Sequence, residues 1–129
     1  NMQVSTCILM EACMRTQLEK LLASGRDNAL LRFGLGDACL KENDAEQAAV
    51  HLTQATTQQP GYSAAWKLLG KALRQLERLE EAEAAWTAGA AVAQRQGDMQ
   101  AAREMAVFLK RLQKARAGQA IQPAAMPGT

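Results

Sequence analysis

The sequence carries its clearest structural signal in residues 63–96, which read SAAWKLLGKALRQLERLEEAEAAWTAGAAVAQRQ. In the first half of this segment the large apolar residues recur every three or four positions, as on one face of an α-helix: Trp66, Leu69, Leu73 and Leu76. A turn is expected near Glu77-Arg78, and a second helical run extends from Leu79 to about Gln96. The segment therefore predicts two helices that fold back on each other.

The same arrangement occurs earlier in the chain, in residues 29–62. A shift of 34 residues superimposes Leu35, Gly36, Ala38, Glu46, Ala48 and Thr53 on Leu69, Gly70, Ala72, Glu80, Ala82 and Thr87. Glycine within a helix costs about 1 kcal/mol relative to alanine, so its return at the same position indicates a packing requirement. We expect Gly36 and Gly70 to let each first helix cross its partner closely, opposite Ala48 and Ala82.

The two repeats are flanked by further segments with helical patterns. Residues 5–24 predict one helix, whose apolar face holds Met14, Leu18, Leu21 and Leu22. Residues 98–115 predict another, whereas residues 117–129 lack periodicity and are expected to form a disordered tail. The chain thus predicts a single all-α domain over residues 1–116, with about six helices, two complete repeats and a capping helix at each end.

The expected helix starts are marked by residues whose side chains accept backbone hydrogen bonds. Asn28, Asp44 and Ser63 are expected to cap the helices that follow them, and Asp98 is expected to open the last helix. Gly97 suits the left-handed conformation in which many helices end.

These residues resemble the tetratricopeptide repeat, whose pattern is W-x2-L-G-x2-Y followed by A-x3-F, A and P. The second repeat matches it at Trp66, Leu69, Gly70, Leu73, Ala82, Trp86 and Gly89, and the first at Leu35, Gly36, Cys39, Ala48, Leu52, Ala55 and Pro60. Arg32 stands where an aromatic residue or leucine is expected, and Gln94 replaces the closing proline. The whole chain resembles the small two-repeat bacterial proteins of this family. The resemblance implies a right-handed stack of antiparallel helix pairs with a concave groove lined by the first helix of each pair.

Charge is distributed unevenly along the chain, although the formal net charge is only +2. Residues 1–62 hold five basic and seven acidic side chains, and residues 63–129 hold ten basic and six acidic ones. A net charge this small does not indicate nucleic acid binding by itself, but the C-terminal half is where an acidic partner would bind. Apolar residues make up 48% and charged residues 22%, as in globular domains, and no apolar run has the length of a membrane span.

The sequence has no constellation typical of a catalytic or metal site. His51 is the one histidine and has no cysteine or carboxylate at metal-ligand spacing, so we expect a surface or partly packed side chain. The run Gly34-Leu35-Gly36 lacks the third glycine and the preceding strand of a phosphate-binding loop. We interpret the chain as a non-enzyme without cofactor or metal.

Protein binding is the favoured function, because members of this family hold peptides or partner helices in the concave groove. The groove positions carried over by resemblance are Leu30, Phe33, Asp37, Lys67, Lys71, Arg74, Arg103, Val107, Lys110 and Arg111. Lys67, Lys71 and Arg74 have i, i+4, i+7 spacing and so share one helix face. We predict a scaffold or adaptor that binds an acidic or amphipathic peptide or helix through these cations, with an apolar anchor at Leu30 and Phe33.

Two other functions stay open. Residues 8–22 are apolar on more than one face, so the N-terminal helix either caps a monomer or joins two copies in a weak homodimer. The basic residues could also follow nucleic acid phosphates, but little aromatic surface is expected in the groove beyond Phe33, which favours peptide. Cys7, Cys13 and Cys39 form no C-x-x-C pair, which is typical of a reducing compartment, so a cytoplasmic location is expected.

Overall fold

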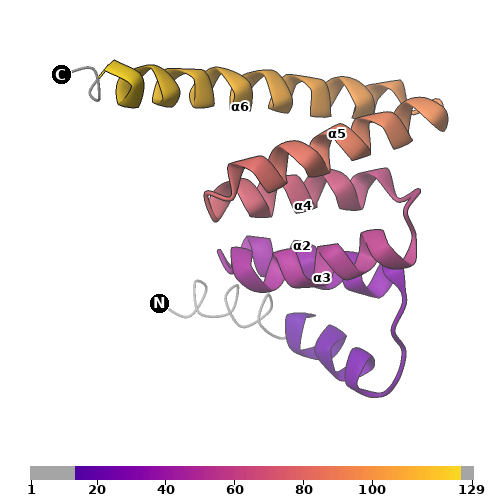
Figure 1. The fold of residues 1–129 in the computed structure, drawn as a ribbon. Coiled ribbons are helices and arrows are strands. Elements are labelled where there is room, and N and C mark those ends of the chain that lie inside the picture. Colours follow the sequence, from indigo (N-terminus) through magenta and orange to yellow (C-terminus); the bar gives the residue numbers. More distant parts are fainter. Residues whose placement is uncertain (1–13, 126–129) are drawn as a thin grey trace, which may run out of the picture.

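The computed structural model describes residues 14–125, with side chains up to residue 117 (Figure 1). A helical segment at residues 14–23 is followed by α2 (Ala29–Lys41), α3 (Ala45–Gln58), α4 (Ser63–Gln75), α5 (Leu79–Arg95) and α6 (Met99–Ala125). The part of the chain so described contains no β-strand. Because α2 pairs with α3 and α4 pairs with α5, the predicted all-α fold of stacked helix pairs is confirmed.

Three of the four expected helix caps are present. The side chains of Asn28, Asp44 and Asp98 each accept a hydrogen bond from the backbone N–H three residues later, at 2.8, 3.2 and 3.2 Å. The cap expected at Ser63 is wrong, because the carbonyl of Tyr62 already accepts the first N–H groups of α4. Tyr62 is therefore the N-cap residue and Ser63 is the first residue of α4, whose start has no hydrogen bond to a capping side chain.

The stack is curved, with the first helix of each pair on the inner side. Helix α4 packs close to both α2 and α6, whereas the backbones of α3 and α5 do not come close to each other anywhere along their described lengths. A cleft of about 550 Å³ separates α3 from α5 and reaches down to Trp66 and Leu69 of α4. The stack therefore bends toward the side on which α2, α4 and α6 approach one another and away from the side on which α3 and α5 lie apart. Its concave side consists of α2, α4 and α6.

Each helix pair depends on a glycine where its two helices cross. A Cβ atom added to Gly36 would overlap the side chain of Leu52, and one added to Gly70 would overlap Trp86. Leu52 and Trp86 are buried and occupy the same position of the 34-residue repeat. The packing requirement inferred from the glycines is therefore real, but these two large side chains fill the space rather than the expected alanines.

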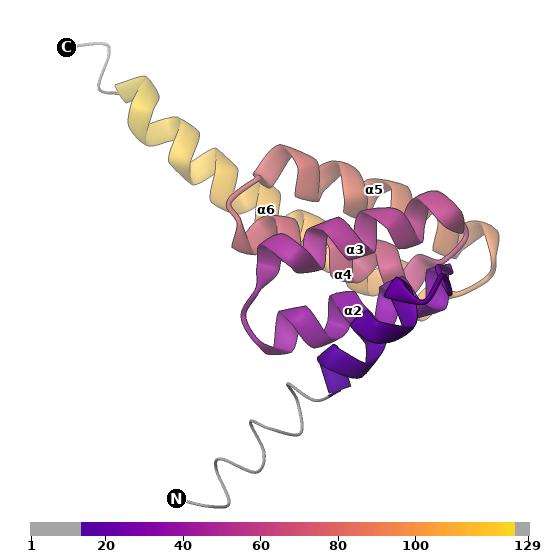
Figure 2. The same ribbon diagram turned by 90° about the horizontal axis from the view of Figure 1, so that it is seen from below.

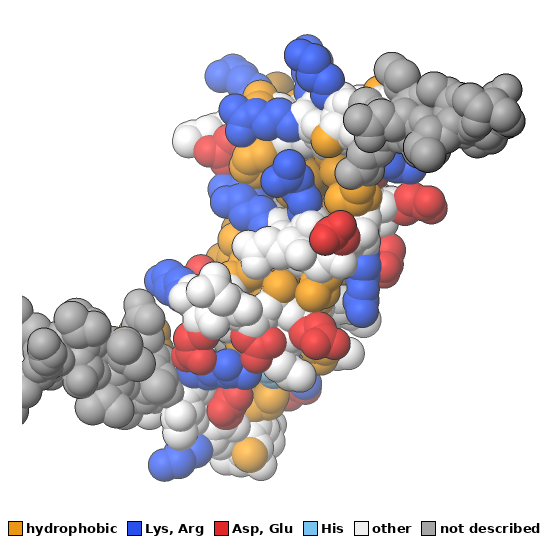
Figure 3. Space-filling view, turned by 90° about the vertical axis from the view of Figure 1, so that its left-hand side faces the viewer, with side chains coloured by type: hydrophobic (Ala, Val, Ile, Leu, Met, Phe, Trp, Pro, Cys, Tyr) orange, Lys and Arg blue, Asp and Glu red, His pale blue; other side chains and the backbone are white. Residues whose placement is uncertain are grey.

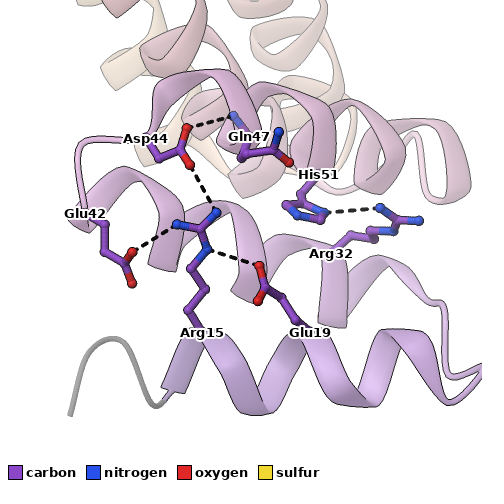
Figure 4. A network of polar contacts seen from close by, with 7 residues as sticks. All are labelled: Arg15, Glu19, Arg32, Glu42, Asp44, Gln47 and His51. Atoms are coloured by element: carbon purple, nitrogen blue, oxygen red, sulfur yellow. Dashed lines mark hydrogen bonds and ion pairs between the residues drawn. The ribbon is translucent and has the colours of Figure 1, made fainter. Parts of the chain in front are cut away.

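A charged contact holds the N-terminal segment on the first repeat. The Arg15 guanidinium donates to Glu42 at 2.9 Å and to Asp44 at 3.0 Å, at the turn between α2 and α3 (Figure 4). The hydrogen bond to Glu42 raises the pKa of Arg15 above its usual value. Residues 14–23 thus lie where the sequence predicts a capping helix, and the rest of that predicted helix, residues 5–13, lies outside the described residues.

The last helix is longer than the sequence predicts. Residues 98–115 were expected to form it, with a tail at 117–129, whereas α6 continues to Ala125. Its buried side chains extend as far as Leu112, and the C-terminal part projects beyond the other helices (Figure 2). Helix propensity does not explain the extension, because alanine recurs in this stretch but Gly118 and Pro123 disfavour a helix. Residues 126–129 lie outside the described range.

Alanine substitutions at two glycines of α2 test whether Gly36 is required where α2 crosses α3. We expect Gly36→Ala to lower the free energy of unfolding by about 1–3 kcal/mol, because the added methyl group overlaps Leu52. We expect Gly34→Ala to raise it by about 0.5–1 kcal/mol, because alanine favours the helix and its methyl group would meet only Leu18, at 3.6 Å. Urea unfolding followed by circular dichroism measures both, and equal effects of the two substitutions would contradict the role assigned to Gly36.

Candidate functional site

The residues expected in the groove separate into distinct groups, of which the first lies on α2. Leu30 is 71% exposed, and Phe33 stacks on Tyr62 with the ring centroids 4.9 Å apart. Asp37 is paired with Lys41 of the same helix at 3.3 Å. The α2 part of the concave side is therefore largely apolar, and its charges are balanced.

Lys67 of α4 is neutralised by α6. Its ammonium donates to the Glu104 carboxylate at 2.9 Å, beside a hollow of about 240 Å³ between the first turns of the two helices. This hydrogen bond lowers the pKa of the Glu104 carboxyl group. Lys67 thus joins α4 to α6, and its charge is already matched within the chain.

Three other expected residues meet around one pocket. Lys71 and Arg74 of α4 and Arg111 of α6 line a pocket of about 430 Å³, whose apolar lining includes Trp86 and Phe108. None of the three cations forms an ion pair with another described residue. Figure 3 shows Lys and Arg side chains gathered with apolar ones over the upper part of one side of the molecule, where α4, α5 and α6 lie.

Phe108 is a pocket residue that the sequence analysis missed. Its ring centroid lies 5.2 Å from that of Trp86, at an interplanar angle of 38°, and 5.3 Å from the Lys71 ammonium. The finding corrects the expectation of little aromatic surface in the groove beyond Phe33. One signal could have revealed it, because Phe108 precedes Arg111 by three residues and so shares its helix face.

The remaining expected residues lie elsewhere on α6. Arg103, Val107 and Lys110 are exposed, with Val107 44% accessible, and they line neither of these two hollows. Of the basic residues that the sequence predicts in the groove, the structure therefore brings together only Lys71, Arg74 and Arg111 at this pocket.

A separate polar network lies inside the first repeat. Arg32 donates to both carboxylate oxygens of Asp27, at 2.9 and 3.0 Å. Its other nitrogen lies 3.1 Å from Nδ1 of His51 (Figure 4). Hydrogen bonds from Arg32 and then from Gln58 lower the pKa of Asp27 to about 2. His51, expected at the surface or partly packed, is buried, because Arg32 replaces an apolar residue and supplies a polar partner for the ring.

The described residues offer few groups for chemistry. Within residues 14–125, no three His, Cys, Asp or Glu side chains gather in an arrangement that would hold a metal ion. Cys39 is fully buried, and burial raises the pKa of its thiol to about 11. No helix in the same range has both the length and the apolar character that a membrane span requires.

Comparison with known proteins finds relatives of matching length and fold. A family model described as tetratricopeptide repeat matches residues 40–106. A TPR repeat-containing protein of Pseudomonas aeruginosa is 56% identical over 99 residues, which make up 77% of this chain and 94% of that protein. A solution structure of a Bordetella parapertussis protein is 42% identical, with a TM-score of 0.70 over 81% of this chain and 90% of that one. A tetratricopeptide repeat domain protein of Salinibacter ruber, 22% identical, has the same fold, with a TM-score of 0.62 over 67% of this chain and 87% of that one.

The buried histidine predicts that stability depends on pH. Burial, followed by the nearby Arg32 cation, lowers the pKa of His51 below its usual value of 6.5, although Glu19 and Asp27 act in the opposite direction. The unfolded chain then binds the proton more tightly, so the free energy of unfolding decreases as the pH falls below about 6.5. We expect His51→Gln to reduce this decrease, since its side-chain carbonyl cannot titrate but can still accept from Arg32.

Urea unfolding of both proteins at neutral pH and at mildly acidic pH measures the difference. Carboxylates with low pKa values, such as Asp27, titrate at a lower pH than the mildly acidic pH of this measurement, so they add little to the difference. The same pH slope in wild type and His51→Gln would show that His51 is not the group responsible.

Proposed function

The chain belongs to the tetratricopeptide repeat family, and from this premise we propose that it is a scaffold or adaptor with no reaction of its own. Its concave side binds an acidic or amphipathic peptide or helix of a partner protein. The observation that carries this proposal is the convergence of Lys71, Arg74 and Arg111, unpaired within the described residues, on a pocket with an apolar lining.

Energetics favour a partner that uses both properties of the pocket. An exposed ion pair contributes only about 0.2–1 kcal/mol, so three cations alone give weak binding. Apolar burial adds about 25 cal/mol per Å² of surface removed from water. The exposed Leu30 and the stacked Phe33 and Tyr62 supply further apolar surface on α2 for a longer segment.

The state of Cys39 supports a cytoplasmic location for this function. Cys39 is a buried thiol with a raised pKa, as in structural cysteines that stay reduced. We therefore place the proposed interaction in the cytoplasm, where thiols remain unpaired.

Charge reversal at the pocket tests the proposal. We expect Lys71→Glu, Arg74→Glu and Arg111→Glu, combined in one protein, to abolish retention of the protein partners that wild type captures from lysate, because the pocket then repels acidic segments. Quantitative mass spectrometry of the captured proteins measures the loss, and circular dichroism checks that helicity is kept.

The matched control carries the same change of charge away from the pocket. Arg78→Glu, Arg95→Glu and Lys114→Glu alter exposed residues that line neither concave hollow. This protein should retain the partners. Retention by both variants, or loss by both, would refute a specific role for the pocket.

A second copy of the chain is the alternative partner. Met14 and Leu21 of the N-terminal segment are 60% and 40% exposed, which favours an apolar contact between two copies. Under this alternative, light scattering at low micromolar concentration gives the mass of two chains, and Met14→Glu with Leu21→Glu restores that of one. A monomer mass for wild type eliminates the alternative.

A further inference from the structure

Lys71 lies over one part of the apolar lining of the pocket between α4 and α6, the ring of Phe108. Its ammonium lies 5.3 Å from the centroid of the Phe108 ring, and no carboxylate within the described residues holds it. A cation over an aromatic ring at an exposed site gains about 0.5–1 kcal/mol. Charge-assisted hydrogen bonds to a carboxylate compete with a contact of that size, and the lysine stem is flexible enough to make the exchange.

The charge of the pocket indicates which ligand group would draw Lys71 away. Arg74 and Arg111 supply two further cations, and Glu77 is the one carboxylate among the lining residues, so the lining has a formal net charge of +2. The complementary group is a carboxylate. Beside it, the ring of Phe108 rests on the buried Trp86 and offers a firm apolar surface.

We propose that Lys71 is a gate for this pocket. A partner carboxylate that binds Lys71 and Arg111 draws the ammonium off Phe108, and a bulky apolar side chain next to that carboxylate takes its place on the ring. The recognised segment therefore carries aspartate or glutamate directly beside leucine, methionine or an aromatic residue. The inference rests on the proposed function, since it specifies how one part of the concave side binds its partner.

Short fluorescein-labelled peptides with the full-length chain provide the test, with fluorescence anisotropy as the readout. One peptide contains leucine–glutamate pairs, and a second replaces each glutamate by glutamine. Arg111→Gln should weaken binding of the glutamate peptide by about three- to fivefold, the size of one exposed ion pair. Lys110→Gln, a change at the neighbouring exposed residue that does not line the pocket, should leave binding unchanged.

The gate itself makes a distinct prediction. Lys71→Gln uncovers Phe108, so this variant should bind the glutamine peptide more tightly than wild type does. Phe108→Ala should weaken binding of the glutamate peptide by about tenfold, as expected for an apolar anchor. Phe108→Leu keeps the apolar volume and should weaken it less, which separates loss of the ring from loss of folding.

Each contrary result has a defined meaning. Unchanged affinity of Lys71→Gln for the glutamine peptide overturns the gate, and equal losses in Lys110→Gln and Arg111→Gln overturn recognition by the pocket. If the glutamate peptide shifts amide resonances around Phe33 but none around Phe108, the inference fails while the proposed function stands. If charge reversal at the pocket also leaves partner retention intact, both fail.

Discussion

The close approach of paired helices at Gly36 and Gly70 is the constraint on which the rest of the structure depends. At Gly70 the missing side chain makes room for Trp86, whose indole N–H donates to the carbonyl of Lys67 at 3.1 Å. Trp86 is thereby fixed between α4 and α5, and its other side supports Phe108 of α6. The position of Trp86 and Phe108 in the pocket lining therefore depends on the absence of a side chain at Gly70.

A third close approach places α6 against the second helix pair. A Cβ atom on Gly89 would lie 2.6 Å from the sulfur of Met105 and 2.6 Å from Cβ of Trp66, so this glycine brings α5 against both α6 and α4. The place of α6 relative to α4 then decides which charges can meet. Lys67 reaches Glu104, whereas Lys71, one turn further on, meets the ring of Phe108.

The elements and their pairing could be predicted from the sequence because they depend on short-range signals, whereas the site depends on distances between helices. The repeat spacing predicts the pairing of α2 with α3 and of α4 with α5, and the capping side chains of Asn28 and Asp44 mark the starts of α2 and α3. Counting the charged residues in each half of the chain does not show which of them form ion pairs. In the first half, Arg15, Arg32 and Lys41 are already paired with carboxylates of the same half. Phe108 was missed for the same reason, since its partners lie on two other helices.

The two repeats differ in the contacts between their paired helices. The titratable His51 lies in the first repeat, whereas the pocket is formed by the second repeat and α6. The first repeat buries His51 against Arg32, and a buried polar pair of this kind contributes little net stability because its desolvation is costly. At the equivalent positions the second repeat has Trp66 and Ala85, which pack with the apolar core instead. Loosening of the His51 contact acts directly on the α2–α3 pair, and it reaches the second pair only through the contacts that α4 makes with α2 and α3. Because His51 lies between α2 and α3, its protonation would act first on that pair, whereas the pocket is built from α4, α5 and α6.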